Sequence, residues 1–115
     1  MIVSVLKSKI HRATVTGSEL DYEGSITIDA KLIRQADMCV GEKVLVANLT
    51  NGARVETYII EGDADSGTVC MNGAAAHHFT AGDKVIIMSF GLVEAEEAGT
   101  FQPTKIKVDD KNRVK

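Results

Sequence analysis

Short runs of β-branched and apolar residues, separated by glycine-centred turns, make up most of this chain. Residues 1–6 and 10–16 are two such runs, and residues 25–28 form a third directly after Gly24. Val, Ile and Thr suit the pleated, half-buried surface of a strand, and the Gly, Asn and Asp residues between the runs suit turns. We predict further strands at residues 43–50, 54–60, 68–71, 84–90 and 105–108.

One segment has helical spacing instead. Asp29 is a suitable N-cap, and Leu32, Ile33 and Ala36 follow it at the spacing of one helix face. We predict a helix that begins after Asp29 and ends within residues 38–41. Residues 94–99 predict a charged turn or a second, short helix.

The clearest hairpin signal is Asn51-Gly52, between two of the predicted strands. These residue types favour a two-residue type I′ turn, in which both central residues have positive φ. We therefore predict that residues 43–50 and 54–60 pair antiparallel. Many short strands with one or two short helices predict a mainly β fold, a small barrel or sandwich, and closure of a barrel would remove exposed strand edges.

Length and charge narrow the class of protein. A chain of 115 residues favours a single domain, 1–115, of which 109–115 form a polar tail that we expect to fray. A net charge of −3 and an aromatic content of 4% argue against a nucleic-acid or anionic membrane surface. No apolar run approaches the roughly 20 residues that a membrane span needs. Cys39 and Cys70 stand alone, which predicts two buried, reduced thiols and a cytoplasmic location.

The common metal and nucleophile motifs are absent from the sequence. His77 and His78 are adjacent, so on a strand they would point to opposite faces and would not bind one metal ion together. We predict that this pair is structural or faces solvent, and that the protein has no metal site.

Two clusters of polar residues are candidates for chemistry. Lys7, Lys9 and His11 alternate along one predicted strand and so share a face. Lysines that protect an edge strand are the commoner explanation, and an anion site for a carboxylate substrate is the other.

The second cluster lies on the return strand of the hairpin. Arg54 and Tyr58 are four residues apart and share a strand face, whereas Thr57 points to the opposite face. A guanidinium that binds a carboxylate would then lie near a phenol that can donate a proton.

The segment Tyr-Glu-Gly-Ser-Ile-Thr-Ile-Asp at 22–29 resembles the self-cleavage site of the aspartate 1-decarboxylases, a pyruvoyl-dependent enzyme family. Other segments match this family in the same order: Lys-Ser-Lys-Ile-His-Arg at 7–12, Thr-Asn-Gly-Ala-Arg at 50–54, Thr57-Tyr58, Asn-Gly-Ala-Ala-Ala-His at 72–77 and Gly82-Asp83. The resemblance extends from residue 1 to about residue 103 and is therefore not confined to one motif.

This resemblance implies a six-stranded double-psi β-barrel that assembles as a homotetramer with active sites between adjacent subunits. It also implies autocatalytic cleavage between Gly24 and Ser25, into a β chain of 1–24 and an α chain of 25–115 that begins with a pyruvoyl group derived from Ser25. That group would bind L-aspartate as a Schiff base and release carbon dioxide, leaving β-alanine for pantothenate and coenzyme A biosynthesis. No metal and no pyridoxal phosphate would take part.

The resemblance also implies roles for individual positions. Ser25 would become the electrophile, Tyr58 would donate a proton, and Thr57 would serve both cleavage and substrate binding. The implied substrate-binding residues are Lys9, Arg54, Thr57, Gly73, Ala74 and Ala75, with Asn72, Tyr22 and His11 as further candidates.

A different class of function fits the same composition, namely a small β-barrel binding or adaptor module in which Ser25 is never processed. Two fragments that meet between Gly24 and Ser25 would favour the enzyme, and one unbroken chain would favour the module. Cleavage is compatible both with a spontaneous reaction and with one assisted by a maturation factor.

Overall fold

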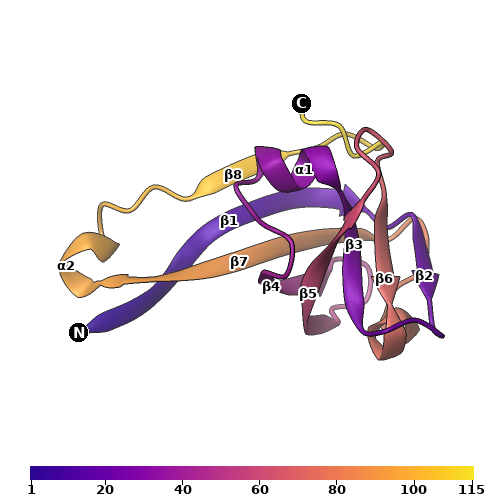
Figure 1. Ribbon diagram of the computed structural model, residues 1–115, viewed down its shortest axis with the longest axis horizontal. Coiled ribbons are helices and arrows are strands. Elements are labelled where there is room, and N and C mark those ends of the chain that lie inside the picture. Colours follow the sequence, from indigo (N-terminus) through magenta and orange to yellow (C-terminus); the bar gives the residue numbers. More distant parts are fainter.

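Strand pairing joins segments that are far apart in the sequence into one eight-stranded sheet (Figure 1). The computed structural model describes residues 1–115. Along the chain the elements are β1 (Ile2–Thr14), β2 (Gly17–Glu19), β3 (Ser25–Asp29), α1 (Ala30–Gln35), β4 (Lys43–Asn48), β5 (Arg54–Gly62), β6 (Val69–Asn72), the 3-10 helix η1 (Gly73–His78), β7 (Lys84–Glu94), α2 (Ala95–Ala98) and β8 (Thr104–Lys107). The strand order in the sheet is β2-β6-β3-β5-β4-β7-β1-β8. None of the helices is long and apolar enough to cross a membrane.

The sheet curves around a single hydrophobic core. Its inner face carries side chains such as Ile10, Ile26, Ile59 and Ile87, all fully buried, within one cluster of 18 buried residues. Leu32 and Ile33 of α1 join this cluster. As predicted, Asp29 caps the helix, because its Oδ1 accepts a hydrogen bond of 2.8 Å from the backbone N–H of Lys31.

The first two predicted strands are one continuous strand, β1. Its pairing with β7 shifts register between Leu6 and Ser8 and again between Ile10 and Ala13. At the second shift Arg12 adopts a positive φ of 63°, as bulge residues do. The two bulges interrupt the alternation of inward and outward side chains but keep Ile10 and Ala13 in the core. Because of this interruption the sequence predicted two strands instead of one.

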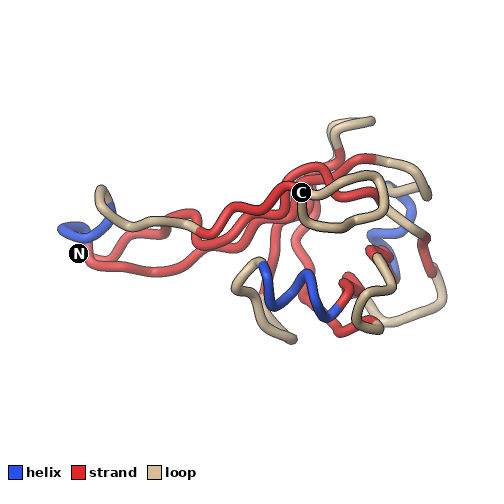
Figure 2. The backbone as a smooth tube through the Cα atoms, turned by 90° about the horizontal axis from the view of Figure 1, so that it is seen from above, coloured by secondary structure: helices blue, strands red, loops and turns tan.

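The first half of β1 and the second half of β7 extend beyond the barrel as a two-stranded arm (Figures 1 and 2). The short helix α2 lies at the tip, where the N–H of Ala95 donates a 2.9 Å hydrogen bond to the carbonyl of Met1. Helix α2 falls within residues 94–99, as predicted. The eight strands exceed the six predicted from the resemblance; β2 is the shortest, with 3 residues, and β6 and β8 have 4 residues each.

Strands β4 and β5 pair antiparallel as predicted, but their turn is different from the predicted type I′ turn. The loop spans residues 49–52, closed by a 2.8 Å hydrogen bond from the N–H of Asn48 to the carbonyl of Ala53. Only Gly52 has positive φ, at 78°. The Oδ1 of Asn51 instead accepts a 2.9 Å bond from the N–H of Ala53, which holds Asn51 without the left-handed conformation.

The expectation that 109–115 fray is wrong. Asn112 is 2% exposed and binds both backbone groups of Thr14, accepting from its N–H at 2.7 Å and donating to its carbonyl at 2.8 Å. Its amide donates a further 2.8 Å bond to the carbonyl of Gly67. The tail is thus held against the barrel by one buried side chain, although most of its residues are polar.

Both cysteines are free, and neither is fully buried. Cys39 is exposed and Cys70 is half-buried, so the prediction of two buried thiols is wrong. Cys39 lies in the loop after α1, which runs over the outside of the barrel, and Cys70 lies on the outer face of β6 opposite Thr27.

Candidate functional site

Ser25 begins β3 in a fully buried position. Its hydroxyl donates a 3.0 Å hydrogen bond to the carbonyl of Glu23 and accepts one of 3.0 Å from Nδ2 of Asn72. Asn72 is also the register partner of Ser25 across the antiparallel β3–β6 ladder. The strand pairing therefore brings a predicted processing residue and a predicted site residue into direct contact, with the serine oxygen held between a donor and an acceptor.

Gly73 packs against Gly24, the residue that precedes the bond marked for cleavage by the sequence. A Cβ at Gly73 would lie 2.8 Å from Cα and 2.9 Å from N of Gly24, and 3.0 Å from the carbonyl oxygen of Tyr22. Gly73 also has a φ of 74°, which L side chains rarely adopt. Both the backbone angle and the close approach require glycine, and the result is that 22–24 lie directly on the start of η1.

The small-residue segment after Gly73 is the 3-10 helix η1. Ala74 is exposed, Ala75 is half-buried against the core, and the two histidines end the helix in exposed positions. His77 and His78 are thus not on a strand, and the predicted opposition of their side chains across a sheet does not apply. The structure contains no group of three or more His, Cys, Asp and Glu side chains that could hold a metal ion.

Tyr58 and Ser25 come from neighbouring strands of the sheet. Strands β3 and β5 run parallel from the pair Ile26–Ile59, and Ser25 and Tyr58 each precede that pair by one residue. Tyr58 is 38% exposed, and the residues at alternate positions, Arg54 and Glu56, are also exposed. This outer face carries the guanidinium and the phenol together, as the strand spacing predicts.

Thr57 points to the other side of β5, where it is half-buried. The β4–β5 pairing runs without a register shift from Lys43 opposite Tyr58 to Ala47 opposite Arg54, so no bulge turns Thr57 toward the outer face. Thr57 and Tyr58 nevertheless both line one shallow hollow of about 300 Å³, together with Lys43 and Glu56. Lys43 and Glu56 close one side of this hollow with a 2.6 Å ion pair.

Lys9 is far from this group within one chain. It pairs with Met88, which pairs with Leu45, which in turn pairs with Glu56 of β5. Three strand spacings separate Lys9 from β5, or about 14 Å at ~4.8 Å per strand. Lys9 therefore lies on the same outer face as Arg54 and Tyr58, but a single chain does not bring it to Ser25.

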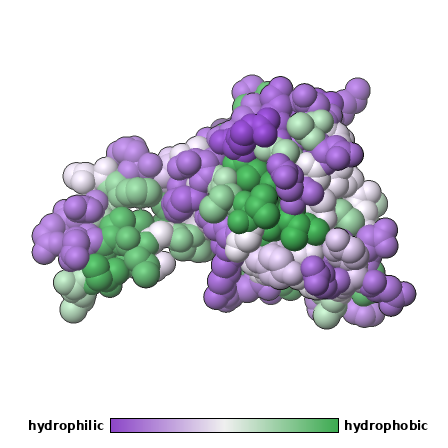
Figure 3. All heavy atoms as spheres, viewed as in Figure 1, coloured by the Kyte–Doolittle hydropathy of each residue, from purple (hydrophilic) through white to green (hydrophobic).

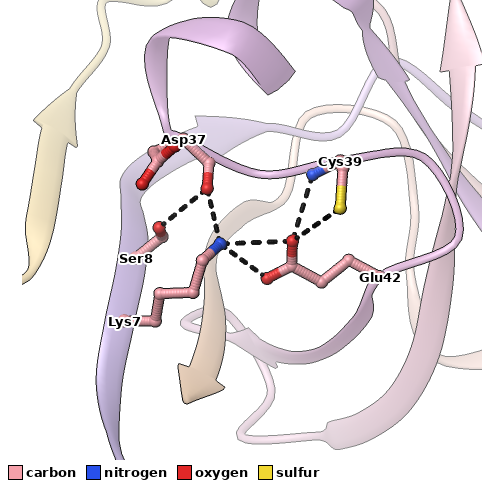
Figure 4. A network of polar contacts seen from close by, with 5 residues as sticks. All are labelled: Lys7, Ser8, Asp37, Cys39 and Glu42. Carbon is pink, nitrogen blue, oxygen red and sulfur yellow. Dashed lines mark hydrogen bonds and ion pairs between the residues drawn. The ribbon is translucent and has the colours of Figure 1, made fainter.

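Lys9 does not protect a sheet edge, because β8 pairs with β1 over residues 8–11. Lys7 instead binds the loop after α1 (Figure 4): its Nζ donates to the carbonyl of Asp37 at 2.5 Å and to both carboxylate oxygens of Glu42, at 2.9 and 3.2 Å. Glu42 also accepts from the N–H and the thiol of Cys39. Lys7 is thus committed to a structural contact, and Lys9 is the cation of this cluster that is free of such a contact.

His11 lies opposite Lys107 of β8 in a basic surrounding. Burial lowers the pKa of His11, and the positive charges of Lys9, Arg12, Lys107 and Lys115 lower it further. Both effects disfavour the protonated imidazole. Tyr22, the remaining candidate, is 54% exposed in the loop before Gly24.

The structure thus brings together Gly24, Ser25, Asn72, Gly73 and Tyr58, and leaves Lys9 and His11 on another strand.

Two neighbours of Asn72 were not predicted from the sequence. Thr27 accepts a 3.0 Å hydrogen bond from its Nδ2, and the Sγ of Cys70 donates to its Oδ1 at 3.5 Å. Strand alternation could have found them, since Thr27 is two residues after Ser25 and Cys70 two before Asn72.

Comparison with known proteins agrees with this arrangement. A family model described as aspartate decarboxylase matches residues 1–115. The chain is 55% identical over 114 residues to an aspartate 1-decarboxylase of Corynebacterium efficiens, covering 99% of this chain and 84% of the relative. A protein of the same name from Myxococcus xanthus is 56% identical over 110 residues, covering 96% and 85%. For one from Listeria monocytogenes the identity is 52% over 114 residues, covering 99% and 90%.

A solved structure shares the fold. A rationally designed protein, mkDPBB_sym1, superposes with a TM-score of 0.50 at 20% identity, covering 76% of this chain and 99% of the designed one. The mainly β, double-psi β-barrel fold predicted from the resemblance is thereby confirmed. With a family match over its whole length and relatives that are more than half identical, the chain belongs to the aspartate decarboxylase family.

Proposed function

We propose that this protein is an aspartate 1-decarboxylase, which releases carbon dioxide from L-aspartate and leaves β-alanine for pantothenate and coenzyme A biosynthesis. Relatives with that name share 51–56% of their residues with this chain over nearly its whole length. The observation that carries the proposal is the buried Ser25 hydroxyl, held by Asn72 beside a Gly24 that packs on Gly73. This arrangement supports a reaction of Ser25 with the peptide that precedes it.

The first reaction that we propose is cleavage of the chain by Ser25. Its Oγ bonds to the carbonyl carbon of Gly24 and the C–N bond of that peptide breaks, so the amide becomes an ester and the proton of the hydroxyl ends on the freed amine. Loss of the Cα proton of residue 25 then breaks the Cβ–Oγ bond, and Oγ leaves as part of the Gly24 carboxylate. Water hydrolyses the resulting dehydroalanine to a pyruvoyl group, releasing ammonia. The products are chains 1–24 and 25–115.

The residues around Ser25 fit such a group. Residue 25 is paired in β3 with Asn72, so the new N-terminus would stay in the ladder after cleavage. Gly24 has no atom within 4 Å of an added Cβ, so the other end has open space on the side to which a Cβ would point, away from Gly73. The pyruvoyl group supplies a ketone that reacts with the substrate amine and takes up the electron pair left by the departing carbon dioxide.

The remaining residues would bind and orient the substrate. Arg54 offers a guanidinium fork for one carboxylate of aspartate and Lys9 a point charge for the other. Tyr58, adjacent to residue 25 in the sheet, would return a proton to the α-carbon. Thr57 lines the same hollow as Tyr58 and would contact the substrate from the opposite side of β5. Helix η1 would contact the substrate through the backbone of Ala74 and Ala75. Tyr22, His11 and Asn72 would support these contacts.

We further propose that the protein assembles as a homotetramer with each site shared between adjacent copies. Lys9 lies three strands from β5, so a second copy has to supply it if it is to meet Arg54 and Tyr58. The arm supports association, because Ile2, Phe90 and Leu92 are 53%, 48% and 76% exposed on one of its faces. Figure 3 shows hydrophobic atoms gathered over this arm. A two-stranded arm is marginally stable without packing partners.

The free thiols of Cys39 and Cys70 are in keeping with a cytoplasmic location.

The test is the intact mass of the purified protein together with an assay for β-alanine. We expect two fragments that meet between Gly24 and Ser25, and an unbroken, inactive chain for Ser25→Ala. Gly17-Ser18 is a second Gly-Ser pair in the sequence, so Ser18→Ala is the control and is expected to leave both cleavage and activity unchanged. A single unbroken chain without activity, even after incubation with cell extract, would favour the binding module. Normal decarboxylation by Ser25→Ala would overturn the proposed chemistry.

A further inference from the structure

The side chain of Asn72 makes three hydrogen bonds on the outer face of β3 and β6. Its Nδ2 donates to the hydroxyls of Ser25 and Thr27, each at 3.0 Å, and its Oδ1 accepts from the thiol of Cys70 at 3.5 Å. The ladder explains why these groups meet, because Ser25 pairs with Asn72 and Thr27 pairs with Cys70. Asn72 is 2% exposed and Ser25 is 0% exposed, so water does not replace these partners.

A primary amide presents one acceptor and two donors, and its two orientations differ in what Ser25 receives. If Oδ1 faced Ser25, the hydroxyl would donate its proton to Asn72. With Nδ2 facing Ser25, the serine oxygen accepts instead, and its proton goes to the carbonyl of Glu23 at 3.0 Å.

Cys70 and Thr27 favour the second orientation. A thiol is a weak donor and a weak acceptor, and here the Sγ of Cys70 donates to the amide oxygen, which leaves both N–H groups of the amide for the hydroxyls. Burial and the charge of Glu19 raise the pKa of Cys70, which keeps its proton in place for this bond. The Thr27 hydroxyl takes the second N–H, which otherwise would be buried without an acceptor.

We propose that Thr27 and Cys70 are positioning residues for the cleavage at Ser25: together they fix the amide of Asn72 so that its N–H points at the serine oxygen. This inference rests on the proposed self-cleavage. In that reaction Oγ leaves Cβ with the bonding electron pair and becomes a carboxylate oxygen of Gly24. An N–H donor already directed at Oγ stabilises the charge that develops on it without reorganisation.

Two matched pairs of variants test the positioning role. Thr27→Val removes the hydroxyl at nearly constant shape, and Thr27→Ser keeps it. Cys70→Ala removes the thiol donor, and Cys70→Ser keeps a donor. Precursor made by cell-free synthesis is sampled over time, and the fraction cut at Gly24–Ser25 is measured by mass spectrometry. We expect Thr27→Val and Cys70→Ala to cleave roughly tenfold more slowly than wild type, and the two serine variants to stay within about threefold.

The comparison separates this inference from the proposed function. An uncut wild-type chain would contradict both, whereas a wild type that cleaves while all four variants cleave at its rate would overturn the positioning role alone. Equal slowing of the valine and serine variants at position 27 would likewise assign Thr27 to packing and overturn its role. Circular dichroism and thermal melting establish that each variant is folded, and Thr27→Ala replaces Thr27→Val if the latter is not. Asn72→Asp, which cannot donate to Oγ, is expected to slow cleavage at least as much as either loss of a positioning residue.

Discussion

Position 73 requires glycine for two separable reasons, its φ of 74° and the approach of Gly24 to within 2.8 Å of an added Cβ. Gly73→Ala is therefore expected to displace the 22–24 backbone and to slow cleavage at Gly24–Ser25 roughly a hundredfold, because a misplacement of about 1 Å costs that much. Intact mass over time measures it.

The control for Gly73→Ala is Gly52→Ala, since Gly52 has nearly the same φ, 78°, with nothing within 4 Å of an added Cβ. Gly52→Ala has the energetic cost of a left-handed alanine without a clash between the added Cβ and neighbouring atoms. Slowing of cleavage by both variants to the same extent would show that backbone strain, rather than contact with Gly24, accounts for the effect.

Tyr58 is expected to act after cleavage, since the residue is 38% exposed and its hydroxyl makes no hydrogen bond to Ser25 or Asn72. Tyr58→Phe should yield fragments 1–24 and 25–115 at the normal rate and then decarboxylate aspartate about 100-fold more slowly, the usual effect of losing a proton donor. Mass spectrometry and release of β-alanine measure the two steps on the same sample. Unchanged turnover would remove Tyr58 from the role of proton donor.

At the scale of elements, local signals predicted what is held by local contacts. The Asp29 cap, the β4–β5 hairpin and the helix within 94–99 all follow from neighbouring residues. The continuity of β1 does not, because its bulges are set by pairing with β7, more than seventy residues away. The docked tail also depends on a distant partner, since Asn112 is bonded to Thr14.

Asn112 is expected to contribute much of the stability of the docked tail. Asn112→Ala removes three hydrogen bonds of 2.7 to 2.8 Å and leaves the backbone of Thr14 without its partner. We expect the free energy of unfolding, measured with urea, to fall by about 2–3 kcal/mol. Asn51→Ala is the control: Asn51 is exposed in the hairpin loop, so its loss should cost under about 1 kcal/mol. A loss of unfolding free energy for Asn112→Ala no larger than that for Asn51→Ala would mean that the docked tail contributes little to the stability of the barrel.

The Lys7–Glu42 ion pair, which ties β1 to the loop after α1, is expected to make stability depend on pH. Burial raises the pKa of Glu42, but hydrogen bonds, that from Lys7 foremost, outweigh it, and the pKa lies below its ordinary 4.5. Because the folded-state pKa is depressed, the stabilisation is complete above pH 4.5 and is lost as the pH falls through the folded-state value.

Lys7→Met tests this pH dependence. At pH 7 the free energy of unfolding of the variant should be about 2 kcal/mol lower than that of wild type, because the half-buried carboxylate of Glu42 loses its partner. The difference should shrink as the pH falls below 4.5, because protonation of Glu42 removes the ion pair from the wild type. Lys43→Met breaks the exposed Lys43–Glu56 pair, with side chains 77% and 60% exposed, and should have little effect at either pH. A Lys7→Met difference that does not change with pH would contradict a role of the ion pair.

At the scale of the whole molecule, the candidate site divides into a part that one chain forms and a part that it does not. Ser25, Asn72 and Gly73 meet because β3 and β6 pair, and Tyr58 joins them through β5. Sequence spacing alone could place Arg54 and Tyr58 on one face, but not decide whether Lys9 reaches them. The register answers that question for one chain: Lys9 is separated from β5 by β7 and β4.

This separation allows a test of the shared site. Lys9→Ala and Tyr58→Phe should each have little activity alone. If Lys9 of one copy meets Tyr58 of another, co-expression of the two variants should form intact sites from one wild-type Lys9 and one wild-type Tyr58. Random mixing would restore about a quarter of the wild-type sites. The copy that supplies Lys9 has an even chance of carrying the wild-type lysine, and the copy that supplies Tyr58 has an even chance of carrying the wild-type tyrosine. Activity is measured on mixed assemblies isolated with a different affinity tag on each variant.

The control pairs Arg54→Ala with Tyr58→Phe. These residues lie on the same strand, so every site receives one of the two defects and no activity should be restored. Activity of the Lys9–Tyr58 mixture no higher than that of this control would show that one chain supplies both residues, and the proposed sharing between subunits would be wrong.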